Sequence, residues 1–185
     1  MMVRQIIRVI AACVAVGAFA TASFGQKLVA SEGYVAFFSD ATIEDIKAEN
    51  TSSTSIFNVE TGDIAFSIPI AEFVFDKSLM RQHFNEKYME TEKFPRSTFS
   101  GRISGYSREA KGPQPATAKG KLTIHGVTRE IEVPGTLDFQ GDAVIAKSKF
   151  MVKLADYKVK IPQLLWQNIA EEVEVTIDFK FKPKN

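Results

Sequence analysis

The sequence predicts a mainly β protein, an antiparallel barrel of about eight strands that carries two short helices. Three observations favour this fold class. Apolar and polar residues alternate along several segments, clusters rich in glycine and proline separate those segments, and only two short stretches have helical periodicity. A sheet of this size with one apolar face must either close on itself or pack against a partner sheet.

The clearest alternation lies near the C-terminus. There Val173, Val175, Ile177, Phe179 and Phe181 alternate with charged or polar residues, which places all five on one face of a strand. One dry and one wet face are typical of a half-solvated antiparallel sheet. Similar or weaker patterns predict further strands at 33–39, 55–59, 63–75, 99–104, 118–125, 129–133, 135–139 and 149–154.

Two stretches have helical spacing instead. Residues 76–88 place apolar side chains three and four positions apart, and Asp76 or Ser78 is a suitable N-cap. Residues 162–170 predict a shorter helix, with Pro162 in its first turn. Both helices are expected to cover an apolar part of the barrel.

Residues 1–22 are predicted to form a secretory signal peptide. Arg4 and Arg8 give a basic start, an apolar run follows over 9–20, and small residues precede the predicted cleavage site after position 22. Cleavage after Gly25 also fits the pattern. The run is too short for a membrane anchor, so the mature protein is expected in the periplasm without a transmembrane segment.

Composition excludes several classes of function. The chain has 185 residues, 45% hydrophobic and 24% charged, with a formal net charge of +1, which suits a single domain over 23–185 and disfavours nucleic-acid binding. The only cysteine, Cys13, lies in the predicted signal, so neither a disulfide nor a cysteine zinc site is expected. Lipid modification of Cys13 is a weaker alternative, because Arg8 leaves too short an apolar segment before it.

Two sets of motifs stand at a distinctive spacing. The first is Thr-Ile-His-Gly-Val-Thr-Arg at 123–129, followed by Val-Pro at 133–134. The second is Met-Arg-Gln-His-Phe at 80–84, followed by Phe-Pro at 94–95 and Thr-Phe-Ser at 98–100. In order and spacing they resemble the YceI-like family of exported bacterial proteins, and the resemblance covers nearly the whole chain after the signal.

The resemblance implies an extended, lipocalin-like barrel whose interior holds an isoprenoid or an isoprenoid quinone. The sequence departs from the family in the first helix. Many members have Arg-Asp-x-His there, whereas Arg81 is followed here by Gln82 and His83. The contacts made by a ligand head group, and with them the identity of the ligand, therefore stay open.

The predicted ligand-facing side chains lie on the apolar strand faces and on the second helix. Alternation alone does not separate side chains that fill a barrel from those that line a cavity. Arg81, His83 and His125 are the predicted head-group contacts. The predicted ligand-facing residues are Phe66, Ile68, Phe99, Ile103, Ile124, Phe150, Val152, Trp166, Val175 and Ile177.

The leading hypothesis is a non-enzymatic protein that binds, stores or transports an isoprenoid-type lipid. One alternative is an exported structural or stress-related protein with a solidly packed barrel and a protein partner. Another is an enzyme that acts on a lipid head group through Arg81 and His83. No cofactor is expected and no metal site, because His83 and His125 lie far apart in the sequence; whether the protein is a homodimer is left open.

Overall fold

The computed structural model describes residues 27–40, 45–161 and 170–184. Its helical elements are the 3₁₀ turn η1 (Ile70–Glu72), α1 (Ser78–His83), the π-helical turn η2 (Phe84–Tyr88) and the 3₁₀ turn η3 (Leu154–Tyr157). Its strands are β1 (Lys27–Ser39), β2 (Ile46–Asn50), β3 (Thr54–Asn58), β4 (Asp63–Pro69), β5 (Val74–Phe75), β6 (Arg96–Ser104), β7 (Gln114–Ile124), β8 (Val127–Gln140), β9 (Ala143–Lys153) and β10 (Glu172–Pro183).

Eight of these strands form a closed antiparallel barrel, which confirms the predicted fold class. The order around the barrel is β1-β3-β4-β6-β7-β8-β9-β10, and β10 pairs with β1 to close the ring. The closing ladder is long, from Leu28 opposite Pro183 to Phe38 opposite Glu174. Closure gives β1 and β10 a partner strand on both sides, which is how a half-apolar sheet avoids pairing with other chains through its outermost strands.

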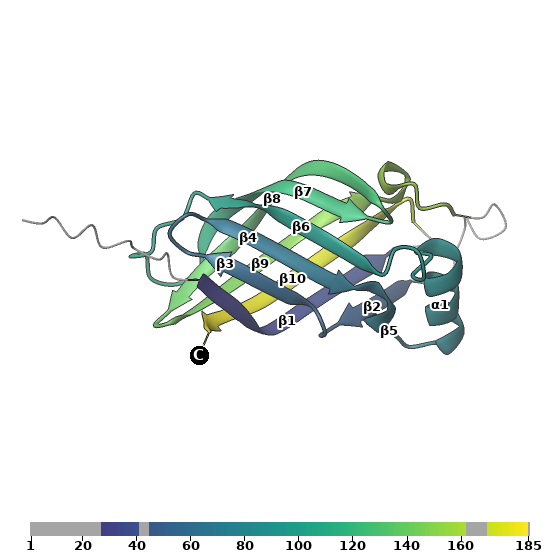
Figure 1. Ribbon diagram of the computed structural model, residues 1–185, viewed down its shortest axis with the longest axis horizontal. Helices are drawn as coiled ribbons and strands as arrows, with labels where there is room; N and C mark the ends of the chain where they lie inside the picture. Colours follow the sequence, from purple (N-terminus) through teal and green to yellow (C-terminus); the bar gives the residue numbers. More distant parts are fainter. Residues whose placement is uncertain (1–26, 41–44, 162–169, 185) are drawn as a thin grey trace, which may run out of the picture.

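The remaining two strands extend one end of the barrel. The start of β1, Lys27 to Val29, pairs with β3, whereas its end, Val35 to Ser39, pairs with β2. Strand β5 then pairs with β2, and α1 follows β5 directly. Figure 1 shows α1, β2 and β5 together at one end of the barrel, opposite the end that holds the C-terminus. We call the α1 end the mouth.

Several predicted elements differ in extent from the structure. Residues 129–133 and 135–139 belong to one strand, β8, and Pro134 is tolerated within it because the ladder to β9 begins only at Gly135. The expected strand 63–75 is interrupted by η1. Strands β1 and β7 are longer than predicted, and β2 was not predicted.

The first predicted helix is present as α1 and η2, which together cover 78–88. The second, at 162–170, lies outside the described residues except for its last position, as do the predicted signal peptide 1–22 and Trp166. In the parts of the chain that are described, no helix has the length and apolar character needed to cross a bilayer.

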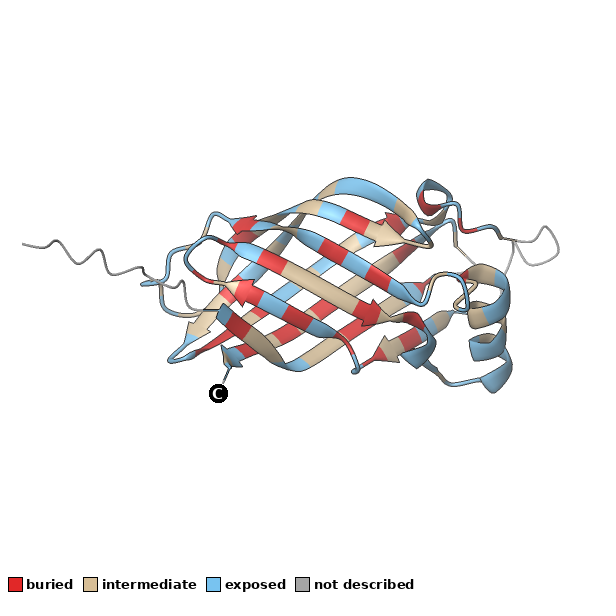
Figure 2. Cartoon of the chain, in the orientation of Figure 1, coloured by how far each residue is buried: buried red, intermediate tan, exposed pale blue. Residues whose placement is uncertain are grey.

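Aromatic side chains fill the barrel at the end opposite the mouth. Phe57, Phe179 and Phe181 are fully buried, and the rings of Phe57 and Phe181 lie 5.7 Å apart. The Tyr106 ring joins them at 6.1 Å from Phe57, and its hydroxyl donates a hydrogen bond to the Val59 carbonyl at 2.9 Å. We call these four aromatic residues the plug. Figure 2 shows the corresponding alternation of buried and exposed residues along the strands.

We expect Phe181→Ala to lower the free energy of unfolding by about 3–5 kcal/mol, since it removes a fully buried ring and leaves a hole in the plug. Phe38→Ala is the matched control, because Phe38 is 37% exposed on the outer face of β1 and should lose only about 1 kcal/mol. Urea denaturation measures both changes. Equal losses would show that the plug is not a tightly packed unit.

Candidate functional site

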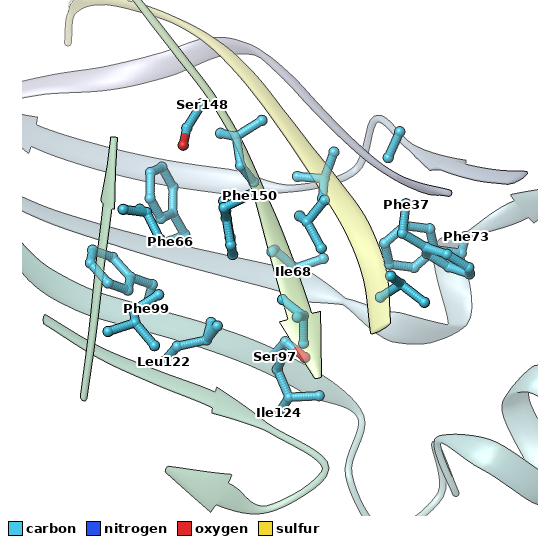
Figure 3. A pocket seen from close by; sticks show the side chains of 18 of the residues that line it. Phe37, Phe66, Ile68, Phe73, Ser97, Phe99, Leu122, Ile124, Ser148 and Phe150 are labelled. Atoms are coloured by element: carbon cyan, nitrogen blue, oxygen red, sulfur yellow. The ribbon is translucent and has the colours of Figure 1, made fainter. Parts of the chain in front are cut away.

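A cavity of about 300 Å³ runs inside the barrel from the mouth towards the plug. Its walls are mostly apolar side chains from the strands of the barrel, joined at the mouth by residues of β5, α1 and η2. Figure 3 shows side chains such as Phe66, Phe99 and Phe150 gathered around a common space. The volume falls at the lower end of the range of small-molecule pockets. The barrel is therefore hollow, and the solidly packed alternative is not what the structure has.

All the predicted ligand-facing residues that the structure describes line this cavity. Trp166 lies outside the described residues. The other nine are Phe66, Ile68, Phe99, Ile103, Ile124, Phe150, Val152, Val175 and Ile177. Placement in the wall is a structural finding, whereas contact with a ligand stays a prediction.

The inward face of β10 shows where the cavity ends. Val173, Val175 and Ile177 line it, whereas Phe179 and Phe181, on the same face, are fully buried in the plug. The ring of Phe179 lies 5.0 Å from that of Phe66 in the cavity wall. One continuous alternation in the sequence therefore serves two different roles, cavity wall and plug.

Sequence reasoning missed an aromatic cluster at the mouth. Phe37, Phe73, Phe75 and Phe84 all line the cavity, and their ring centroids lie 5.0–5.9 Å apart in the contacting pairs. The cluster fastens η2 to β1 and β5. We call these four residues the mouth cluster.

The reason for missing Phe73 and Phe75 is a change of phase. In a continuous strand over 63–75, Phe66, Ile68 and Val74 would share one face. The 3₁₀ turn η1 shifts the alternation, so that Val74 is 66% exposed and the two phenylalanines on either side of it face inward. Pro69, at the start of this turn, was the signal in the sequence.

Two strands of the wall approach each other closely at a pair of facing glycines. Gly101 on β6 lies opposite Gly120 on β7, and the Phe99 ring reaches over both. A Cβ atom at Gly120 would lie 2.4 Å from the Ser100 carbonyl oxygen and 2.9 Å from the Phe99 ring. The two glycines thus make room for an aromatic side chain that lines the cavity.

The three predicted head-group residues are not brought together. His83, on α1, lines the cavity at the mouth. Arg81 is exposed and donates a hydrogen bond to the Ala71 carbonyl at 3.3 Å. His125 is not part of the cavity wall.

His125 instead fixes the turn between β7 and β8 to two other segments. Its side chain is 10% exposed, with Nε2 3.1 Å from a Glu90 carboxylate oxygen and Nδ1 3.3 Å from the Tyr157 carbonyl oxygen. Its ring packs edge-on against Phe94 at 4.5 Å. His125 has a φ of 50° and Gly126 one of 72°, as a two-residue hairpin turn requires.

Electrostatics at the mouth follow from these contacts. Hydrogen bonds from Lys93 and, second, from His125 hold the pKa of Glu90 below its ordinary value, so Glu90 is ionised at neutral pH. Burial raises the pKa of Tyr88 and Tyr157, both in the cavity wall, so their hydroxyls stay protonated there. In the described ranges, no three His, Cys, Asp or Glu side chains are grouped closely enough to hold a metal ion.

The sequence and the structure were compared with those of known proteins. No curated protein matches the chain in sequence. Among solved structures, a polyisoprenoid-binding domain from Saccharophagus degradans, described as implicated in plant cell wall breakdown, aligns with a TM-score of 0.72 at 14% identity. The alignment covers 86% of this chain and 99% of that domain.

Two further structures have the same fold. BcnA of Burkholderia cenocepacia aligns with a TM-score of 0.68 at 18% identity, over 80% of this chain and 95% of BcnA. The YceI protein of Campylobacter jejuni aligns with a TM-score of 0.61 at 16% identity, over 79% of this chain and 90% of that protein. The family model for the YceI-like domain matches residues 18–181 of this sequence. The chain therefore belongs to the YceI-like family.

Proposed function

We propose that this protein binds an isoprenoid-type lipid, an isoprenoid or an isoprenoid quinone, inside its barrel, and stores or carries it. The observation that carries the proposal is the cavity of about 300 Å³ with an apolar wall, closed at one end by the plug. The similar Saccharophagus degradans domain, named as polyisoprenoid-binding, supports the same class of ligand.

The apolar wall supplies the affinity in this proposal. Each buried CH₂ group contributes about 0.8 kcal/mol, so about ten buried carbons would contribute about 8 kcal/mol before the cost of association. Van der Waals contact with branched and aromatic side chains suits a methyl-branched chain. A polar head group is not required for binding, and His83 is the predicted head-group residue best placed to contact one.

We propose a binding role rather than catalysis. The enzyme hypothesis needs Arg81 and His83 to act together on a head group. Arg81 is exposed and bonded to the Ala71 carbonyl, whereas His83 lines the cavity. Export to the periplasm, with removal of 1–22, is part of the proposal and accounts for the basic start and apolar run of the sequence.

The direct test is to purify the protein under mild conditions from the organism that encodes it and to analyse an organic extract by mass spectrometry. We expect a prenyl lipid in near-stoichiometric amount. As a control, Ala118→Phe protein from the same host should yield less lipid. Recovery of no lipid, together with failure of the apoprotein to bind geranylgeraniol, would contradict the proposal.

Ala118→Phe should weaken binding of fluorescently labelled geranylgeraniol by about tenfold or more, because the added ring occupies space that the ligand needs. Lys119→Phe adds the same ring at the next position, which is exposed on the outside of β7. Titration of both variants should show wild-type affinity only for the outward substitution. Equal affinities would remove the cavity as the binding site.

His125→Asn should lower the free energy of unfolding by about 1–3 kcal/mol, because it removes the contacts to Glu90 and Phe94 while asparagine tolerates the positive φ. Affinity for the geranylgeraniol probe should stay within about twofold of wild type. Chemical denaturation and probe titration separate the two effects. A loss of affinity at unchanged stability would favour the head-group role instead.

Glu90→Gln should lower the melting temperature at neutral pH but not in acid. The folded-state pKa of Glu90 is depressed, so its contribution to stability is present above the ordinary value of 4.5 and is lost as the pH falls through the folded-state pKa. Thermal unfolding of both proteins across this range checks the prediction. A difference that grows towards low pH would contradict it.

A further inference from the structure

The barrel wall is interrupted between β8 and β9. The two strands pair only from Gly135 opposite Ser148 to Gln140 opposite Ala143. Beyond that point, residues 127–134 of β8 pair with β7, and residues 149–153 of β9 pair with β10. We call the space between these two unpaired edges the β8–β9 slit. Its length along β9 is about 16 Å, at about 3.3 Å per residue.

Both ends of the slit are fastened. At the inner end, the Ser148 hydroxyl donates a hydrogen bond to the Pro134 carbonyl at 2.6 Å. At the mouth, Arg129 Nε donates to the Asp156 carbonyl of η3 at 3.1 Å, and His125 contacts the Tyr157 carbonyl. A gap held at both ends is a feature of the wall, not fraying of a strand end.

The cavity extends to the inner end of the slit, where the β8–β9 ladder stops. Inward-facing Gly135 and Ser148 line it, as expected from the alternation of a strand. Pro134, Thr136 and Lys147, which face outward, line it as well. Residues of both strand faces therefore border the cavity where the ladder ends, next to the slit. Further along the slit, its inner sides are the apolar Ile131, Val133, Phe150 and Val152.

The outer rims of the slit are polar, and each rim forms an ion pair with the neighbouring strand to which it is already paired. Glu132 on β8 pairs with Lys119 on β7 at 3.3 Å, and Lys149 on β9 pairs with Glu174 on β10 at 2.8 Å. Each ion pair therefore fastens one rim to the intact sheet beside it. The slit therefore has charged, solvent-facing rims on the outside and apolar side chains on the inside.

Among the described residues, aromatic side chains are gathered at both ends of the cavity. The plug closes the end away from the mouth, and at the opposite end the four rings of the mouth cluster line the cavity and pack against one another through Phe37 and Phe84. Passage at the mouth requires those rings to separate. Passage at the slit requires the two edges to move apart between their fastened ends, and no ladder hydrogen bond joins them there.

We propose that the β8–β9 slit is a lateral opening through which the apolar chain of the ligand enters and leaves the cavity. The inference rests on the proposed function, since it assigns a route to the same ligand. A slit suits a long flexible chain, which can be threaded or laid in sideways, better than a bulky fused-ring lipid.

Cross-linking the slit tests the route. Glu132→Cys with Met151→Cys places two exposed thiols on opposite rims, in a Cys13→Ser background, for joining by a short bis-maleimide. Lys119→Cys with Glu132→Cys is the matched control, because the same reagent then joins β7 to β8, which are already paired at these positions. Stopped-flow fluorescence with labelled geranylgeraniol gives association and dissociation rates before and after cross-linking.

We expect the cross-linked slit to slow association and dissociation together by about tenfold or more, with little change in equilibrium affinity, and the control to change neither rate. Unchanged rates in the cross-linked slit variant would overturn the lateral route while leaving lipid binding intact. Lost affinity at an unchanged association rate would also overturn it. Failure of the uncross-linked proteins to bind the probe would overturn both the route and the proposed function.

Discussion

The pairing of β1 with β10 is the constraint on which the rest of this structure depends. That ladder joins the first and the last described strand over most of the length of the barrel, from Leu28 opposite Pro183 to Phe38 opposite Glu174. Without it, both strands would be exposed edges and the apolar face of the sheet would meet water. With it, the strands form a ring around the interior, and the side chains that point inward determine whether a position is filled or left open.

Those side chains divide the interior into three zones. Large rings that meet across the barrel form the plug, branched and smaller residues such as Val175 and Ala118 leave the cavity, and the mouth cluster packs η2 against the sheet. The outer surface has a different character. There, ladders of opposite charge, such as Lys147 with Asp178 at 2.8 Å, link neighbouring strands where water screens them.

The sequence predicted the barrel and most of the cavity wall because alternation reports which face a residue occupies. It could not report how far apart opposite walls stand, so Ile177 in the wall and Phe179 in the plug looked equivalent. It also failed where the phase of alternation changes, at η1 beside Phe73, and where a ladder ends, at Pro134. Both failures concern pairing between distant segments, which a local pattern does not contain.

The position of Phe179 sets a limit on length. Successive inward residues of a strand stand about 6.6 Å apart, so the plug stops any chain inserted from the other end at a fixed depth. The depth of the cavity therefore limits how many carbons of a ligand chain can be enclosed, and any carbons beyond that number must stay outside the barrel. A family member with a small residue at this position, and the same strand register, would have a cavity about one inward-facing residue deeper and could enclose a longer chain.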